Sequence, residues 1–168
     1  MTVKRITAAV TRRGYLQEDD HMLKGISPLI SPNLLKTLCE MGHGDELVIA
    51  DGNFPSESVG QNAVVIRADG HGVPELLDAI LKLIPLDAYV EKPVALMEVA
   101  PGDSCPTPEI WNVYKKILEK YEPDNCAIDM TERFAFYERA KKAYLIIATG
   151  ETAIYANILL KKGVVKPE

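Results

Sequence analysis

The sequence is poor in the residues that usually identify metalloproteins and disulfide-rich proteins. It has three cysteines in 168 residues, an odd number without a CxxC pair, so neither a disulfide framework nor a cysteine-ligated zinc site is predicted. Histidine also occurs three times, and no HxxxH or HExxH pair is present, which leaves a metal ion without a recognisable ligand set. We therefore expect no metal, and reduced cysteines of the kind found in cytoplasmic proteins.

Other missing patterns exclude further classes of protein. No GxGxxG or GxxxxGK[ST] run is available to hold a nucleotide phosphate, and no GxSxG run supplies a serine nucleophile. No apolar run approaches the ~20 residues that cross a bilayer. A net charge of −5 disfavours nucleic acid or an anionic membrane as a partner. We expect neither an organic cofactor nor a nucleic-acid or membrane partner.

The composition indicates one α/β domain preceded by an extension. With 47% hydrophobic and 26% charged residues, the chain can bury a substantial core. Residues 1–21 differ, because four Lys or Arg side chains precede the first acid, Glu18. Such a start is either a mitochondrial transit peptide or a poorly ordered extension ahead of Met22, and the position at a terminus favours the second. We assign the domain to residues 22–168.

Apolar patterning alternates between short strands and amphipathic helices. Strands are predicted near residues 47–50, 63–69, 93–100, 126–130, 143–150 and 156–162, and helices near residues 32–41, 73–84, 108–121 and 132–142. Ser31 is expected to cap the first helix and Thr107 the third, while Gly42 should end the first in a left-handed conformation. The alternation favours an α/β fold in which a largely parallel or mixed sheet lies between helical layers.

The segment MGHGDELVIADGNFP, residues 41–55, carries the first candidate chemistry. His43 follows the helix end, where it either satisfies backbone groups or carries a proton near neutral pH. Asp51 follows the apolar strand, where it either caps the turn DGNFP or accepts hydrogen bonds from a hydroxyl-rich ligand. The two side chains lie at opposite ends of one strand. A shared site then requires the connection to fold back along the sheet, or a second subunit to complete it.

Near the end of the chain, GETAIYAN places Tyr155 and Asn157 two residues apart. At strand spacing both side chains face the same side, which suits recognition of a polar ring. Alternatively, Tyr155 is a core aromatic and Asn157 a turn residue. The pattern leaves both interpretations open.

Four segments carry a resemblance to a known family: LKGISPLISPNLLKTLCEMGHGDELVIADGNFP, PLDAYVEKPVALMEV, RFAFYERAKKA and TGETAIYANILLKKG. They resemble the RbsD/FucU family of sugar mutarotases, and within it the L-fucose branch. The resemblance implies an RbsD-like α/β fold, a ring-like homodecamer with active sites near subunit contacts, and catalysis without a metal or organic cofactor. The implied reaction interconverts the α and β anomers of a free monosaccharide, with L-fucose as the expected substrate.

The same resemblance implies roles for individual residues. His43 corresponds to the proton donor. Seven further residues correspond to ligand-contacting positions, namely Asp51, Asp87, Met97, Arg133, Tyr137, Tyr155 and Asn157. Arg133 marks the fucose branch, because ribose-type members carry histidine there, and Asn53 stands where some fucose members have histidine and receives no catalytic role. A ribose pyranase of the same family and a monosaccharide-binding accessory protein without turnover are the alternatives.

Overall fold

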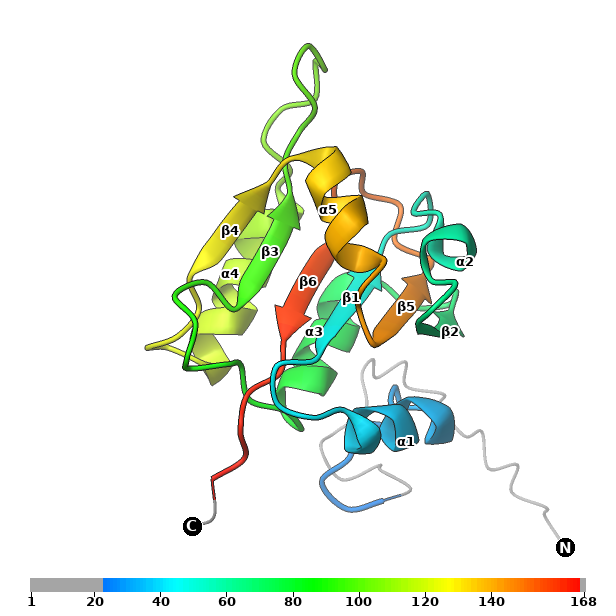
Figure 1. Ribbon diagram of the computed structural model, residues 1–168, viewed down its shortest axis with the longest axis vertical. Helices are drawn as coiled ribbons and strands as arrows, with labels where there is room; N and C mark the ends of the chain where they lie inside the picture. Colours follow the sequence, from blue (N-terminus) through cyan, green and yellow to red (C-terminus); the bar gives the residue numbers. More distant parts are fainter. Residues whose placement is uncertain (1–22, 167–168) are drawn as a thin grey trace, which may run out of the picture.

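The computed structural model describes residues 23–166, so the predicted extension, residues 1–21, lies outside the described residues. The described helices are α1 (Pro32–Glu40), α2 (Ser56–Val59), α3 (Val73–Leu81), α4 (Ile110–Tyr121) and α5 (Arg133–Ala140) (Figure 1). The described strands are β1 (Glu46–Ala50), β2 (Val64–Ala68), β3 (Val94–Met97), β4 (Ile128–Thr131), β5 (Leu145–Thr149) and β6 (Ile158–Lys161).

The described strands form one sheet of six in the order β2-β5-β1-β6-β3-β4. β5 pairs in parallel with β1 and β2, and β3 pairs in parallel with β4, while β6 runs antiparallel between β1 and β3. Five strands therefore point the same way. We call the end of the sheet where these five strands finish and β6 starts the carboxyl end, and the opposite end the amino end. The prediction of an α/β fold with a parallel or mixed sheet is confirmed.

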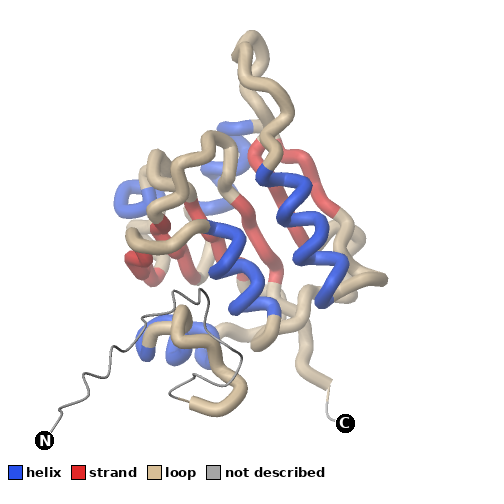
Figure 2. The backbone as a smooth tube through the Cα atoms, turned by 180° about the vertical axis from the view of Figure 1, so that it is seen from behind, coloured by secondary structure: helices blue, strands red, loops and turns tan. Residues whose placement is uncertain are grey.

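Helices cover both faces of this sheet. Figures 1 and 2, which show opposite sides of the molecule, place α3 and α4 on one face and α2 and α5 on the other. Successive residues of β1 point to the two faces in turn, as the pleat of a strand requires. Leu47 and Ile49 belong to the core under α3, whereas Val48 and Ala50 belong to the core under α2 and α5. This double coverage explains why the strand is apolar throughout instead of alternating.

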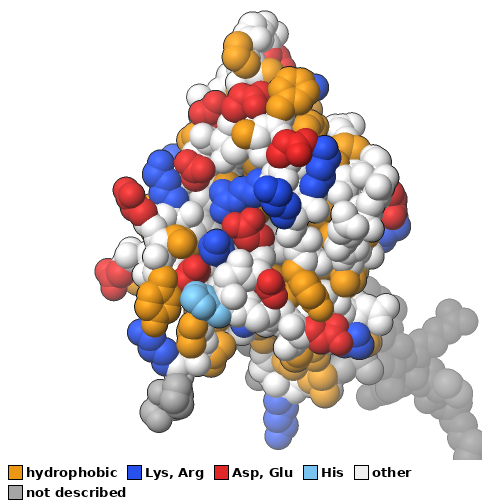
Figure 3. Space-filling model, in the orientation of Figure 1, with side chains coloured by type: hydrophobic (Ala, Val, Ile, Leu, Met, Phe, Trp, Pro, Cys, Tyr) orange, Lys and Arg blue, Asp and Glu red, His pale blue; other side chains and the backbone are white. Residues whose placement is uncertain are grey.

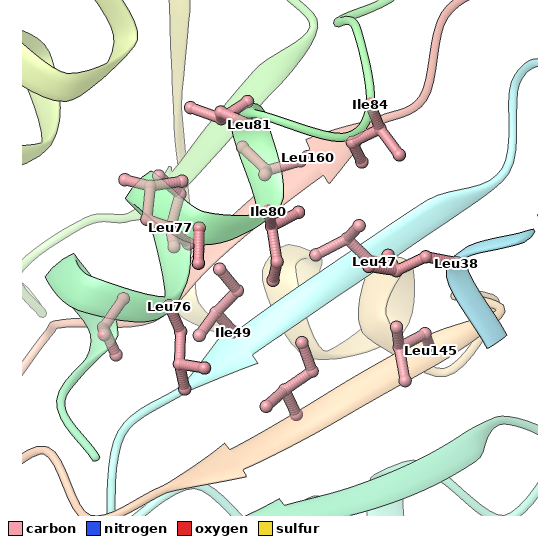
Figure 4. Packing of buried hydrophobic residues seen from close by; sticks show 14 of the residues in the cluster. Leu38, Leu47, Ile49, Leu76, Leu77, Ile80, Leu81, Ile84, Leu145 and Leu160 are labelled. Atoms are coloured by element: carbon pink, nitrogen blue, oxygen red, sulfur yellow. The ribbon is translucent and has the colours of Figure 1, made fainter. Parts of the chain in front are cut away.

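The larger core lies between the sheet and α3. Figure 4 shows Leu47 and Ile49 of β1 facing Leu76 and Ile80 of α3, and all four side chains are inaccessible to solvent. Burying a side chain of this size stabilises a fold by about 1.5–3 kcal/mol relative to leaving it exposed. Because apolar side chains fill both faces, polar side chains that could bind a ligand are expected at the two ends of the sheet.

The first helix begins as predicted but ends differently. Ser31 accepts a hydrogen bond from the Leu34 N–H at 3.2 Å, which confirms the cap. The prediction for Gly42 is wrong, because the extended residue Met41 already ends the helix, and Gly42 does not have a positive φ. Gly44 takes the left-handed conformation instead, with a φ of 85°. The left-handed turn that leads from α1 to β1 therefore follows His43 and does not precede it.

Two other local predictions also differ from the structure. Thr107 does not cap the helix that follows it, because α4 begins at Ile110 and its N-cap residue, Glu109, makes no side-chain cap bond. The pattern predicted no helix at α2, since four residues are too few to show a helical period. α2 nevertheless contributes Val59 to the core on its face of the sheet.

Acidic and basic side chains are interspersed over the face that α5 covers (Figure 3). Arg139 of α5 binds the Glu46 carboxylate through Nε at 3.2 Å and through a terminal nitrogen at 2.8 Å. Its other terminal nitrogen lies 3.9 Å from Asp129. These pairs tie α5 to β1 and β4. None of the described helices has the length and apolar character needed to cross a membrane.

Candidate functional site

Six of the eight predicted site residues meet at the carboxyl end of the sheet. Asp51 follows β1, Met97 ends β3, and Arg133 follows β4. These six residues line one hollow of about 210 Å³ and are Asp51, Met97, Arg133, Tyr137, Tyr155 and Asn157. Asn53 also lines the hollow, together with three residues that the sequence did not single out, Phe54, Asp103 and Ile154. Strand direction brings these segments together, although they are far apart in the chain.

Asp51 and Asn157 form a buried hydrogen-bonded pair in the wall of this hollow. Each residue is 4% exposed. Asn157 Nδ2 donates to Asp51 Oδ2 at 2.9 Å, and the Asp51 N–H donates to Asn157 Oδ1 at 2.9 Å. The other carboxylate oxygen, Oδ1, accepts from the Asn53 N–H at 3.0 Å. Asp51 therefore both caps the turn that follows it and faces the hollow, so its two interpretations from sequence are compatible.

The environment of Asp51 favours a ligand that carries hydroxyl groups. Burial raises the pKa of its carboxyl above the usual value, although four hydrogen bonds, three of them from backbone N–H groups, oppose the shift. An ionised carboxylate that has lost water gains most from polar hydrogens that a ligand brings with it. Arg133 lines the same hollow with donors only. Phe54 and Tyr137 pack with their ring centroids 5.5 Å apart and their planes tilted by 46°, and the rings form an apolar wall.

Tyr155 and Asn157 reach the hollow from a turn, not from a strand. β6 starts at Ile158, and Tyr155 has a positive φ of 57°. The prediction of strand spacing is therefore wrong, although both side chains do line one hollow. A residue other than glycine in this left-handed region costs about 1–3 kcal/mol. The surrounding structure must hold the turn in place.

Helix α4 supplies that support through two aromatic side chains. Trp111 Nε1 donates to the Tyr155 carbonyl at 2.8 Å, and the Tyr114 hydroxyl donates to the Ala156 carbonyl at 2.7 Å. Tyr114 is inaccessible to solvent, and burial raises the pKa of its hydroxyl, so it remains a donor. These roles have no signal in the sequence, because both aromatics fit the apolar stripe of an amphipathic helix.

The other two predicted residues, His43 and Asp87, meet at the amino end of the sheet. His43 Nε2 lies 3.0 Å from Asp87 Oδ1, and the Tyr89 N–H donates to the same oxygen at 3.0 Å. Burial opposes ionisation of Asp87, but the hydrogen bonds from Tyr89 and His43 outweigh it and hold the pKa of the carboxyl below its usual range. The ionised carboxylate orients the imidazole of His43. His43 therefore pairs with a carboxylate instead of satisfying backbone groups at the helix end.

The predicted residues thus fall into two groups at opposite ends of the sheet. The five residues of β1 alone span roughly 16 Å, so in one chain His43 does not reach a small ligand held by Asp51. The sequence had placed the two residues at opposite ends of one strand, and the structure confirms that separation. Within residues 23–166, no cluster of three or more His, Cys, Asp or Glu side chains is arranged to hold a metal ion.

The fold and the hollow define an α/β protein with a polar site, built around a buried carboxylate, at the carboxyl end of its sheet. Residues 24–165 match the model of the RbsD / FucU transport protein family, and the chain belongs to this family. It is 53% identical to the fucose mutarotase of Homo sapiens over 148 residues, which are 84% of this chain and 94% of that relative.

Solved structures agree with this assignment. The fucose mutarotase of Streptococcus pneumoniae in complex with L-fucose has a TM-score of 0.80 and 55% identity, over 86% of this chain and 100% of that one. RbsD of Bacillus subtilis complexed with D-ribose has a TM-score of 0.62 and 25% identity, over 82% of this chain and 95% of that one. The fold is shared with both, and the fucose branch is the more similar.

Replacing Tyr114 with phenylalanine tests the support that α4 gives to the site. Tyr114→Phe leaves the buried Ala156 carbonyl without its donor, which should lower the free energy of unfolding by about 1–3 kcal/mol. Urea unfolding followed by the fluorescence of Trp111, the single tryptophan, measures the loss. Tyr121→Phe is the matched control, because its partner Asp78 is partly exposed and keeps its bond to Lys120 at 2.8 Å. No buried group is then left unpaired, and the loss should be about 0.5–1.5 kcal/mol. Equal losses in the two variants would contradict the assigned role.

Proposed function

We propose that this chain is a fucose mutarotase, which interconverts the α and β anomers of L-fucose. The observation that carries this function is the buried Asp51–Asn157 pair, set beside Arg133 and Met97 in one hollow. The chain that contains it is 53% identical to a fucose mutarotase over 94% of that relative.

The reaction needs little chemical machinery. The hemiacetal ring opens, the anomeric carbon rotates about one bond, and the ring closes on the other face of the aldehyde. Opening delivers a proton to the ring oxygen and removes one from the anomeric hydroxyl, so a proton carrier suffices without a nucleophile or a metal ion. General acid–base catalysis contributes about 10²–10⁴-fold, which matches a reaction that already proceeds slowly in water.

In this proposal the residues of the hollow bind the sugar. Asp51, Arg133 and Asn157 hold its hydroxyl groups, because together they supply charged and neutral hydrogen-bond partners of both kinds. Met97 and Tyr137 form apolar walls. The Met97 thioether suits the methyl group at C6 of a 6-deoxy sugar, since it offers no strong partner to a hydroxymethyl group there.

His43 acts as the general acid and base in this proposal, with Tyr155 as a relay. Support comes from its contact with Asp87, whose carboxylate lies 3.0 Å from Nε2 and orients the imidazole for proton transfer. Because His43 and Asp51 lie at opposite ends of the sheet, we infer that a neighbouring subunit supplies the imidazole, and Asp87 then acts through His43 or contacts the sugar beside it. A ring-like homodecamer of the family type provides such contacts. The three cysteines are free, which supports a cytoplasmic location.

A panel of sugars tests the function and its alternatives. Exchange between anomers, measured by saturation-transfer NMR, should be accelerated for L-fucose. L-Galactose, which differs only in a hydroxymethyl group at C6, should exchange about 10- to 100-fold more slowly because Met97 gives that hydroxyl no partner, and D-ribose should also be slower. Faster exchange of D-ribose would identify a ribose pyranase. Binding of L-fucose by titration without faster exchange would identify a binding protein.

Replacing His43 tests the assignment of the proton carrier. His43→Asn should retain the fold, because the side chain is 46% exposed, and should lower the exchange rate by about 10²–10⁴-fold. Mixing this variant in equal amounts with an inactive Asp51→Asn chain should restore about a quarter of the wild-type activity if subunits reassort at random. In such a mixture, one contact in four joins a subunit that has His43 to a neighbour that has Asp51. Either His43→Asn at the wild-type rate or no recovery after reassortment would contradict the proposal.

The raised pKa of Asp51 predicts how sugar affinity depends on pH. The ionised carboxylate is the form that accepts hydroxyl hydrogen bonds, so affinity for L-fucose should fall as pH decreases and the carboxyl is protonated. Because burial raises this pKa, the midpoint should lie above ~3.9, the usual value for aspartate. Titration calorimetry between about pH 4 and 7 measures it. Asp51→Asn, which does not titrate, serves as the control and should bind weakly without this dependence.

A further inference from the structure

The loop of residues 98–109 connects β3 to α4 and projects beyond the carboxyl end of the sheet (Figures 1 and 2). The Tyr155 hydroxyl joins it to the hollow. That hydroxyl donates to Asp103 Oδ2 at 2.6 Å and accepts from the Ala100 N–H at 3.2 Å. Asp103 itself lines the hollow beside Asp51 and Asn157. One phenol oxygen of the sugar site is thus bonded twice to a loop to which the sequence assigned no function.

The Asp103 carboxylate is held in place from both sides. Its Oδ1 accepts from the Cys105 N–H at 3.0 Å, while its Oδ2 accepts from Tyr155. The hydrogen bond from Tyr155 lowers the pKa of Asp103 below its usual range, and the same bond raises the pKa of Tyr155. Near neutral pH the pair therefore consists of an ionised carboxylate and a protonated phenol.

The hydrogen bond to Asp103 determines whether the Tyr155 hydroxyl donates to a sugar or accepts from it. A phenol has one proton to donate, and here that proton is already given to Asp103. The oxygen therefore meets a sugar hydroxyl only as an acceptor. A hydroxyl that donates to Tyr155 is polarised toward losing its proton, because the phenol can pass its own proton to the carboxylate behind it. The other charged or titratable groups that line the hollow are Asp51, Arg133 and Tyr137.

We propose that Asp103 is a positioning residue for anomer exchange, which orients Tyr155 to receive the proton of the anomeric hydroxyl and accepts the Tyr155 proton in turn. The inference rests on the proposed function. On ring opening, the O–H bond of the anomeric hydroxyl breaks as one forms on the Tyr155 oxygen, and the original Tyr155 O–H bond breaks as one forms on Asp103. The bond between the anomeric carbon and the ring oxygen breaks as that oxygen takes a proton from the His43 imidazolium. Ring closure reverses each transfer, so protons and charge balance.

The test compares exchange kinetics of L-fucose in wild type, Asp103→Asn and Asp103→Glu over a range of sugar concentrations. The asparagine amide oxygen still accepts the Tyr155 hydrogen bond but cannot take its proton. We expect kcat to fall about 10- to 100-fold while KM changes less than about threefold, and Asp103→Glu to recover part of the rate. Asp124→Asn, the same change at an exposed carboxylate in the described loop after α4, should behave as wild type.

A double variant separates action through Tyr155 from a general effect of the loop. If Asp103 acts only through the phenol, adding Asp103→Asn to Tyr155→Phe should slow exchange no further. Three results would overturn the role of Asp103 and leave the proposed function standing. Asp103→Asn could exchange L-fucose with wild-type kinetics, or it could change KM alone. Alternatively, adding Asp103→Asn to Tyr155→Phe could slow exchange by the same factor as Asp103→Asn slows the wild type. A wild-type chain that does not accelerate exchange would overturn the proposed function, and this role with it.

Discussion

The hydrogen bonds between Asp51 and Asn157 are the interaction on which the carboxyl end of the sheet depends. They join the end of β1 to the start of β6, two neighbouring strands whose residues here are 106 positions apart. Asp51 Oδ2 also faces the Ala156 N–H at 3.4 Å, so the strained turn at Tyr155 is tied to the same carboxylate. Removing either partner would leave a buried polar group unpaired, which costs more than an ordinary hydrogen bond contributes.

The buried Asp51 carboxylate and the turn at Tyr155 both lower the stability of the folded chain. The pKa of Asp51 is raised above its unfolded value by burial, so its ionised form, present near neutral pH, is less stable in the folded chain than in water. The left-handed conformation of Tyr155 adds a further cost. Both are offset by long-range contacts, above all the two hydrogen bonds from α4 to the backbone of Tyr155 and Ala156.

The sequence predicts the features that depend on local residue patterns, and it does not predict the roles that depend on long-range contacts. Continuous apolar runs identified the strands, and Asp51 at the carboxyl end of one strand marked the site, because ligands bind there in α/β sheets. The left-handed residue near His43 was misplaced by two positions, since Gly42 and Gly44 satisfy the same local rule. The roles of Trp111, Tyr114 and Asp103 had no sequence signal, because each depends on a partner 42 to 52 residues away.

The proposed proton donor and the proposed sugar site are both open to solvent on the single chain. The imidazole of His43 is 46% exposed, and the hollow around Asp51 is open to solvent on the single chain. A proton donor and a buried carboxylate both act more strongly where water is excluded, because the lower effective dielectric strengthens their interactions with a bound sugar. In the proposed assembly, contact between the amino end of one sheet and the carboxyl end of another would cover the imidazole of His43 and the hollow beside Asp51. Because His43 and Asp51 are separated along β1, the proposed catalysis requires contact between subunits.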